Sequence, residues 1–407
     1  MMNRLNIVVV GTMASDPYAG MAWMHMQIVV GLKRLGHNVW YFETTSTWPH
    51  NPQLGRRVDN ADYSVPYLKD ILKKFGMNGN WAYRCSFSKN KEWIGLSKTK
   101  AEDLLMNADM VFNVSAATRF REEGLKVGRL IYFGTDPVYN EIKYSQGDED
   151  VSSIVDEHHE VVSYGENIGN PDCPIPPLPN LCAKTRQPVL IDFWKNGKAP
   201  NKYEFTTVGN WKQGGRDLHF KGETYYWSKH YEFLKFIDLP KRIKQPIELA
   251  MNLARPETIN HGEGTVVPSL GLATDEYTIL TSNGWKLVDA PSFTTNPWTY
   301  REYIINSRGE FTFAKDQNIR LRSGWFSERS ACYLAAGRPV ITQDTGFGCS
   351  LPTGEGLFAF NTMNEIFSAF DAVNSNYEKH SKAAREIAEE YFKAETVLEK
   401  LLNELGA

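Results

Sequence analysis

Runs of apolar residues alternate with amphipathic segments along the first part of the chain. Asn6–Val10 (NIVVV) is a continuous β-branched run, which predicts a buried strand. Apolar residues then recur at helical spacing: Met24, Ile28, Leu32 and Leu35. Gly36 ends this predicted helix, and Val39–Phe42 begins a second strand. These segments predict a complete β-α-β unit.

The rest of the first half continues the same alternation. Three later apolar runs predict strands that lead into polar or acidic residues: Met110–Val114, Leu130–Phe133 and Val161–Tyr164. Residues 46–100 lack a clear period and are rich in Trp, Asn and Lys, so we expect an elaborate insertion there. The proline-rich passage 170–182 breaks regular structure, and it predicts a linker between two domains.

The second half repeats the alternation and closes on an amphipathic segment. Its predicted strands are Phe205–Val208, Ile247–Ala250, Lys286–Val288, Phe311–Phe313, Val340–Gln343 and Leu357–Phe360. Residues 383–406 place apolar side chains at steps of three and four, which predicts a helix. The pattern therefore predicts an α/β protein with two Rossmann-like domains. We expect them at 1–180 and 186–382, with a final helix at 383–407.

Composition narrows the possible functions. A chain of 407 residues exceeds the usual size of one core, and its 42% apolar and 23% charged residues are typical of globular proteins. The formal charge of 45 − 48 = −3 favours neither nucleic acid nor an acidic membrane as a partner.

The five cysteines form no Cys-x-x-Cys pair, so neither a disulfide framework nor a zinc site is indicated. The opening apolar run is too short for a signal peptide or a membrane span, so we expect a cytoplasmic protein. Nothing in the sequence indicates the oligomeric state.

Residues 323–360 carry the strongest indication of chemistry. A glycine loop containing Gly324 and Trp325 precedes a predicted helix, Ser327–Ala336, and a buried strand follows the Gly-Arg-Pro stop. The first backbone N–H groups of a helix have no partner within it, and its dipole is positive there. This segment therefore predicts an anion site, with Trp325 placed to stack on a base or to fill the core.

The run AAGRPVITQDTG resembles the A-x-G-x-P-V-[IV]-x-x-D-x-G run of bacterial glycosyltransferases with the two-domain GT-B fold. The resemblance implies two Rossmann-like domains facing each other across a cleft, with the last helix crossing back to the first domain. It also implies a nucleoside diphosphate sugar on the second domain and a small-molecule or glycan acceptor on the first. Backbone N–H groups would stabilise the diphosphate leaving group, so no divalent metal or other cofactor is expected.

The same resemblance assigns donor-site roles by position. The first strand of the second domain is followed by Gly209, Asn210, Trp211 and Lys212, where family members contact the diphosphate. Further candidates surround the glycine loop and the later strands: Arg308, Gly309, Lys315, Gly324, Trp325, Ser327, Glu328, Arg329, Asp344, Thr345 and Gly346. Several of the cations are expected to be ordinary surface charges.

The catalytic residues do not follow directly from the motif. Many retaining members carry two glutamates with seven residues between them, but the matching positions here are Gly324 and Cys332, so the chain resembles a divergent branch. Retention and inversion both stay open. An inverting enzyme needs a general base, for which we consider Asp136 at a strand end and His25 on the first helix. Asp136 could instead cap a turn before Pro137, and His25 could simply pack in the core. The adjacent pair at 158–159 points to opposite faces of a strand, so we predict no metal site.

Three other functions compete with glycosyl transfer. A sugar-nucleotide epimerase of the same fold needs carboxylates and histidines in its cleft, whereas the candidates here are mainly Arg, Lys, Asn and Trp. A nucleotide-sugar binding protein without turnover is compatible with the missing glutamates. An NAD-dependent oxidoreductase is disfavoured, because the loop after the first strand lacks a Gly-x-Gly-x-x-Gly pattern.

Overall fold

The computed structural model describes residues 4–45, 47–195, 199–253 and 272–407. These residues fall into two compact units. Unit 1 contains the described residues of Met1–Gly165, Pro176–Leu190 and Lys393–Ala407. Unit 2 contains those of Glu166–Ile175 and Ile191–Phe392.

Unit 1 is built on an eight-stranded sheet in the order β10-β9-β8-β7-β1-β2-β5-β6. Its strands are β1 (Asn6–Val10), β2 (Asn38–Glu43), β5 (Trp81–Arg84), β6 (Trp93–Gly95), β7 (Met110–Val114), β8 (Leu130–Gly134), β9 (Glu160–Ser163) and β10 (Leu181–Lys184). All neighbours run parallel except β5 and β6. From β5 to β9 the strands follow the Rossmann order, with the switch point between β1 and β7.

Helices connect these parallel strands. They are α1 (Ala19–Arg34), α2 (Ser64–Lys74), α3 (Lys98–Asn107), α4 (Phe120–Glu123), α5 (Tyr139–Ser145) and α6 (Glu149–Val155). A two-stranded antiparallel ribbon, β3 (His50–Asn51) with β4 (Arg56–Arg57), lies between β2 and α2 along the chain.

The sequence predicted an elaborate insertion at 46–100, and this prediction is wrong for much of that segment. Its middle forms a regular crossover, because α2 buries one apolar face and β5 pairs in parallel with β2. Only three apolar side chains of α2 make that face: Leu68, Ile71 and Leu72. They stand among lysines over three turns, too short a stretch to give a clear period. Beyond the crossover, the segment adds the β3–β4 ribbon and the antiparallel strand β6.

Unit 2 has a six-stranded parallel sheet in the order β15-β14-β11-β16-β17-β18. The strands are β11 (Phe205–Val208), β14 (Ile247–Met251), β15 (Lys286–Asp289), β16 (Gly309–Thr312), β17 (Val340–Gln343) and β18 (Leu357–Phe360). This is again the Rossmann order, and its switch point lies between β11 and β16. Phenylalanines from three strands, Phe205, Phe311 and Phe360, pack in the core with helix side chains.

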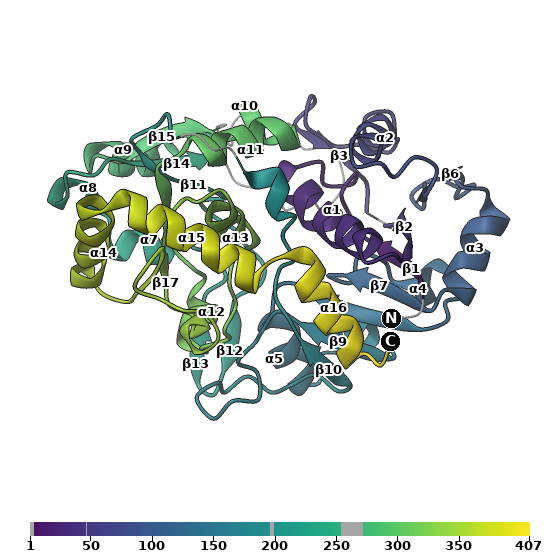
Figure 1. Ribbon diagram of the computed structural model, residues 1–407. Coiled ribbons are helices and arrows are strands. Elements are labelled where there is room, and N and C mark those ends of the chain that lie inside the picture. Colours follow the sequence, from purple (N-terminus) through teal and green to yellow (C-terminus); the bar gives the residue numbers. More distant parts are fainter. Residues whose placement is uncertain (1–3, 46, 196–198, 254–271) are drawn as a thin grey trace. The chain divides into compact units, whose positions relative to one another are not determined.

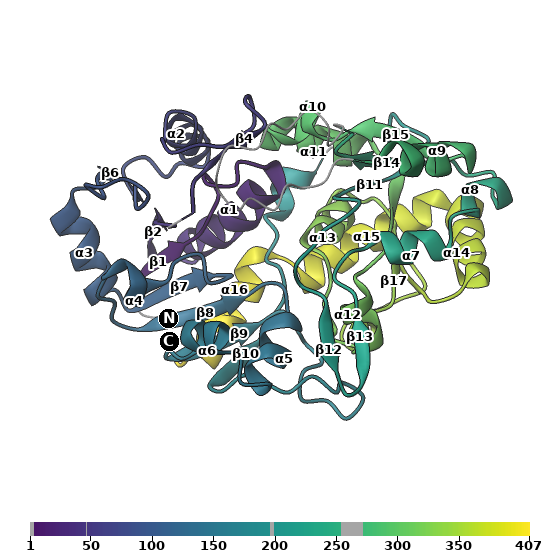
Figure 2. The same ribbon diagram turned by 180° about the vertical axis from the view of Figure 1, so that it is seen from behind.

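Helices pack around the sheet of unit 2 (Figures 1 and 2). They are α7 (His230–Lys235), α8 (Leu239–Arg242), α9 (Thr274–Ser282), α10 (Pro291–Thr294), α11 (Pro297–Asn306), α12 (Asp316–Arg320), α13 (Glu328–Ala335), α14 (Met363–Ser375) and α15 (Tyr377–Tyr391). Single 3₁₀ turns occupy η1 (Ile191–Trp194) and η3 (Phe347–Cys349). An antiparallel ribbon, β12 (Leu218–Phe220) with β13 (Glu223–Tyr225), packs against α12 (Figure 2).

The end of the chain returns to unit 1. The predicted single helix at 383–406 is instead two helices, α15 and α16 (Ala394–Glu404), because the backbone leaves the helical region at Lys393, where ψ is +124° and the residue pairs with Val189. Helix α16 packs against α1 (Figure 1). The chain passes between the units several times, so the boundaries differ in detail from those expected. Strand β10 follows most of the proline-rich passage and still pairs with β9 of unit 1. No helix in the described ranges is long and apolar enough to cross a lipid bilayer.

Candidate functional site

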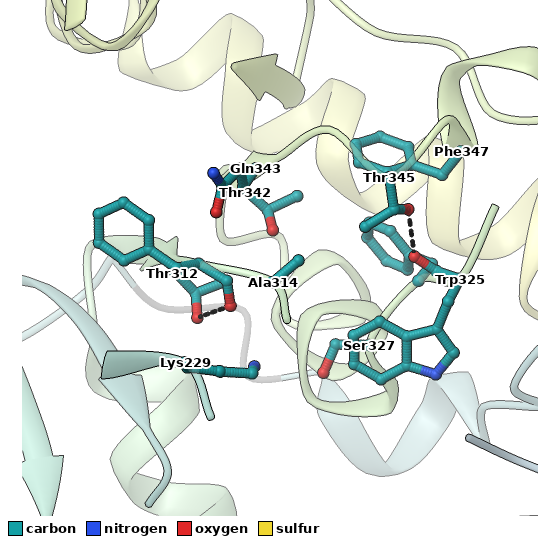
Figure 3. Close-up of a pocket in the computed structure, with 11 residues that line it drawn as sticks. Lys229, Thr312, Ala314, Trp325, Ser327, Thr342, Gln343, Thr345 and Phe347 are labelled. Carbon is teal, nitrogen blue, oxygen red and sulfur yellow. Dashed lines mark hydrogen bonds between the residues drawn. The ribbon is translucent and has the colours of Figure 1, made fainter. Parts of the chain in front are cut away.

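A small pocket opens at the carboxyl edge of the unit 2 sheet (Figure 3). Its walls come from the ends of β16 and β17 and from the loop before α13. The lining residues are Lys229, Thr312, Phe313, Ala314, Trp325, Phe326, Ser327, Thr342, Gln343, Thr345 and Phe347. In open α/β sheets ligands bind beyond the carboxyl ends of the strands, beside the switch point. The pocket occupies that place in unit 2.

The start of α13 supplies backbone donors to this pocket. Ser327 is the N-cap, and the first bond within the helix runs from Ala331 N–H to the Ser327 carbonyl at 3.0 Å. The amides before Ala331 therefore cannot pair inside the helix. Trp325 is held by its backbone, since its carbonyl accepts from the Thr345 hydroxyl at 2.6 Å (Figure 3). Of the predicted residues, Trp325, Ser327 and Thr345 lie together here.

Asn167 fixes the glycine loop, a role that the sequence did not reveal. Its side-chain amide donates to the carbonyls of Arg322 at 3.1 Å and Gly346 at 2.9 Å. Its own N–H donates to the Ser323 carbonyl. Gly324 has a φ of +75°, and a Cβ there would lie 2.8 Å from the Asn167 nitrogen, so this position requires glycine.

Among the described residues that line the pocket, Lys229 is the only lysine or arginine, and sequence reasoning missed it. It lies just before α7, and its ammonium stands 5.8 Å from the centre of the Trp325 ring. In Figure 3 its side chain extends towards Ser327. The lysine is far from the glycine loop in sequence and belongs to no motif, so no local pattern could have identified it.

Arg329 bridges the two strands at the switch point, and its side chain is 13% exposed. Its guanidinium donates to the Glu310 carboxylate at 2.5 Å, to the Val208 carbonyl at 2.6 Å and to the Thr312 hydroxyl at 2.9 Å. Burial by itself would lower the pKa of Arg329, but the carboxylate of Glu310 raises it above its ordinary value. Arg329 therefore ties the ends of β11 and β16 together, and a Cβ at Gly209 would lie 3.9 Å from it.

Other predicted cations have partners away from the pocket. Lys212 forms an ion pair with Glu276 at the start of α9, while Asn210 beside it is exposed. Trp211 is buried and packs against Phe233 at a centroid distance of 5.4 Å, so it serves the core. Lys315 is also buried, with its ammonium 3.1 Å from the centre of the Trp227 ring.

Arg308 and Gly309 lie at the opposite edge of the sheet. They enter β16 at its amino end, whereas the pocket lies at its carboxyl end. Arg308 donates to Asn374 at 2.9 Å, and its backbone N–H donates to the Glu204 carbonyl just before β11. A Cβ at Gly309 would lie 2.3 Å from the Phe205 ring, so this glycine permits close strand packing. The structure thus separates both residues from the pocket.

The remaining predicted residues support loops. Asp344 accepts from the Gly346 N–H at 2.8 Å and lies 3.6 Å from Arg322, whose guanidinium also binds Asp172 at 2.8 Å. Gly346 has a φ of +87°, as the turn after β17 requires. Glu328 begins α13 and accepts from the Cys332 thiol at 3.1 Å.

In unit 1, Asp136 lies in a turn just beyond β8. The neighbouring Ser115 and Thr135 hydroxyls, from the loops after β7 and β8, are 2.5 Å apart. Val138 has a φ of +101°, a strained conformation for a β-branched residue, and its N–H is held by Glu141 at 2.7 Å. Burial raises the pKa of Glu141 to about 7, and the negative charge of Asp136 adds to the shift. Asp136 is thus held at the carboxyl edge of its sheet, where ligands of such folds bind.

His25 is buried behind the loop that follows β1. It is 1% exposed, its Nδ1 lies 2.7 Å from the Met21 carbonyl, and its Nε2 accepts from Thr12 N–H at 3.4 Å. Burial lowers its pKa to about 4, so it is neutral at neutral pH. A Cβ at Gly11 would lie 2.2 Å from the ring. A general base must contact its substrate, so this position supports a packing role for His25.

The described residues contain no group of three or more His, Cys, Asp or Glu side chains that could hold a metal ion. The pocket in unit 2 instead offers amides, hydroxyls, one ammonium and an indole ring. These groups suit an anion joined to an aromatic ring system.

The solved structures that this chain resembles include glycosyltransferases. HepE from Anabaena, solved with UDP and glucose, aligns over 99% of this chain and 100% of its own, with a TM-score of 0.57 and 10% identity. An alpha-glucosyltransferase in complex with UDP and DNA aligns over 100% of both chains, with a TM-score of 0.56 and 10% identity. Sucrose-phosphate synthase from Thermosynechococcus elongatus aligns over 99% of both, with a TM-score of 0.54 and 12% identity.

No known protein-family profile and no curated protein sequence matches the chain. The likeness is therefore one of fold. The chain has the GT-B fold, with two Rossmann-like domains, that the resemblance of AAGRPVITQDTG predicted.

Proposed function

We propose that this protein is a glycosyltransferase that moves a sugar from a nucleoside diphosphate sugar to an acceptor. The observation that carries the proposal is the pocket at the carboxyl ends of β16 and β17, against the start of α13. Free amides and a positive dipole at a helix start stabilise negative charge. That charge grows on the diphosphate as the glycosidic bond breaks, so the same groups favour departure of the leaving group.

Lys229 and Trp325 complete the proposed donor site. The Lys229 ammonium would pair with a phosphate oxygen, and the indole ring of Trp325 offers a flat apolar face to the nucleoside. Asn167 and Arg329 would act indirectly, because they hold the glycine loop and the strand ends in place. The UDP present in two of the similar structures makes UDP the first nucleotide to test.

We place the acceptor on unit 1, with Asp136 as the candidate base if the reaction inverts the anomeric centre. The strained turn that presents Asp136 supports this choice over the buried His25. In a retaining reaction the departing phosphate would take the acceptor proton instead. Proton NMR of the product's anomeric centre distinguishes the two courses. Independence from metal ions and a cytoplasmic location stay predictions from the sequence.

Donor binding tests the proposal through Lys229. We expect Lys229→Ala to weaken UDP binding on the order of 10- to 100-fold, because a charge-assisted hydrogen bond contributes about 1.5–3 kcal/mol. Isothermal titration calorimetry with UDP measures the change. Lys241→Ala is the matched control, since it removes the same charge from an exposed position on α8 of the same unit. Equal UDP affinity in wild type, Lys229→Ala and Lys241→Ala would exclude this donor site.

Turnover separates the competing activities. A transferase releases UDP from a UDP-sugar in proportion to added acceptor, and Asp136→Asn should lower kcat on the order of 100-fold or more if Asp136 is the base. An epimerase converts the UDP-sugar without acceptor and without net loss of the sugar. A binding protein retains UDP affinity and shows neither reaction. The addition of EDTA should leave UDP binding unchanged if the site needs no metal.

A further inference from the structure

A second pocket, of about 420 Å³, lies in unit 1 where the β3–β4 ribbon meets the start of α2. The two elements are side by side in both views (Figures 1 and 2). Six of the described residues line the pocket: Asn51, Gln53, Asp62, Tyr63, Pro66 and Tyr67. None of them belongs to the donor site of unit 2 or to the turn that holds Asp136.

Two tyrosines give this pocket a flat aromatic wall. The rings of Tyr63 and Tyr67 are one helical turn apart, with centroids 6.0 Å from each other and planes inclined by 18°. The hydroxyl of Tyr67 is buried, so the part of that side chain that can face a ligand is its ring. Pro66 between them adds a rigid apolar surface. The C–H faces of a pyranose ring pack on such aromatic surfaces, and the hydroxyls at its rim stay free for hydrogen bonds.

The remaining lining residues of the pocket are polar. Asn51 and Gln53 contribute amides, each with donor and acceptor groups, and Asp62 contributes an acceptor. Asn51 Oδ1 already accepts from the backbone of Gln53 at 3.0 Å, which fixes the orientation of its amide. Amides and carboxylates beside aromatic rings match the alternating donors and acceptors of a sugar's hydroxyl groups.

The ribbon that carries Asn51 and Gln53 is held in place before any ligand binds. Arg57 donates to the Trp48 carbonyl at 2.5 Å and to Asp16 at 2.9 Å. The backbone of His50 donates to the Ser15 carbonyl, and its ring stacks on Tyr18 at 5.6 Å. These contacts fasten the ribbon to the loop after β1. Ligand binding therefore does not carry the entropic cost of ordering the ribbon.

We propose that this pocket is a binding subsite for a neutral saccharide, which makes a glycan the acceptor class. The proposal rests on the function proposed above, since it names the acceptor of that transfer. We infer that the ligand is neutral because the described residues that line the pocket include one carboxylate and no cation. Single-stranded nucleic acid also stacks on aromatic rings, but its phosphates would meet Asp62 without a compensating Lys or Arg among those residues.

Binding of maltotriose, cellotriose and chitotriose to the full chain tests the subsite. Saturation-transfer NMR, in the absence of donor, should show contact with at least one of these probes. We expect Tyr63→Ala to weaken that binding on the order of 10-fold, Tyr63→Phe to preserve it and Asp62→Asn to weaken it less. Tyr277→Ala, which truncates an exposed tyrosine of unit 2, is the control and should have no effect.

Each outcome decides one of the two proposals. If none of the three saccharides binds at millimolar concentration, or if Tyr63→Ala binds them as wild type does, the subsite is wrong. Preference for a short oligothymidylate over all three would also overturn it. UDP titration of the same variants keeps the donor site separate, because Tyr63→Ala should bind UDP with unchanged affinity. Failure of wild type to bind UDP would instead count against the function proposed above.

Discussion

Glu43 shows how one buried carboxyl group can organise a whole loop. It ends β2, and it accepts hydrogen bonds from the N–H groups of Ala14 at 2.8 Å and Ser15 at 2.5 Å. The Tyr41 hydroxyl also donates to it, at 3.0 Å. Burial raises the pKa of Glu43 from its ordinary 4.5 to about 7. The loop after β1, to which the β3–β4 ribbon is fastened, is therefore held by a group that titrates near neutral pH.

Replacement of Glu43 by glutamine should remove this pH dependence. A carboxyl group with a raised pKa binds more protons in the folded chain, so its contribution to stability is complete at low pH. It is lost as the pH rises between 4.5 and about 7. Glu43→Gln should be less stable by about 1–3 kcal/mol, since its amide nitrogen faces a backbone N–H. The deficit should be larger at about pH 5 than at about pH 8, as measured by urea unfolding.

The exposed Glu102 on α3 provides the control for this experiment. Glu102→Gln should change stability little, because this side chain lies at the surface. Parallel stability curves for wild type and Glu43→Gln across this pH range would show that Glu43 does not titrate as the structure implies.

At the scale of elements, the contact between α1 and α16 depends on one glycine. A Cβ at Gly31 would lie 2.5 Å from Leu398 Cδ1 and 3.0 Å from the Cβ of Ala394. Gly31 thus lets the last helix approach α1 closely. Gly20 lies on the same helix, but a Cβ there would meet no described neighbour within 4 Å.

These two glycines form a matched pair for mutagenesis. Gly31→Ala should destabilise unit 1 by about 1–3 kcal/mol through overpacking, reduced by up to about 1 kcal/mol of gained helix propensity. Gly20→Ala should be neutral or stabilising, because it gains propensity without a clash. Urea unfolding of both variants measures the difference. Equal effects of the two substitutions would mean that α16 is not packed on α1 in solution.

Elements were predicted well where apolar runs are long and buried. Strands such as β1, β7, β11 and β17 match their predicted ranges, because buried parallel strands appear as continuous β-branched runs. Predictions failed where an element is short or its ends depend on distant contacts. Helix α2 was missed for the first reason. The break between α15 and α16 was missed for the second, since Lys393 pairs with Val189 at that point.

At the scale of the whole molecule, the two units should respond differently to the donor nucleotide. Addition of UDP should slow amide hydrogen exchange at 323–331 and 342–347, which surround the proposed donor pocket. A saccharide that fits the second pocket should instead slow exchange at 50–67 of unit 1. Hydrogen-exchange mass spectrometry with each ligand alone measures both patterns. Protection by UDP confined to 50–67 would contradict the assignment of donor and acceptor to the two units.

The sequence by itself determined the α/β class, the two Rossmann-like halves and the glycine loop before α13. These properties depend on local patterns: apolar runs, helical spacing, and glycines that permit unusual backbone angles. Trp325, Ser327 and Thr345 could be placed at one site because all belong to the same motif or follow the end of the next strand.

Only the tertiary structure decided which charged side chains face that site. Arg329, Lys212 and Lys315 were equivalent candidates as cations, but their partners are Glu310, Glu276 and Trp227. Lys229 instead reaches the pocket from an unrelated segment. A cation's role depends on which distant acceptor or aromatic ring lies within reach once the strands have paired. The spacing of residues along the chain does not encode that long-range geometry in any local pattern.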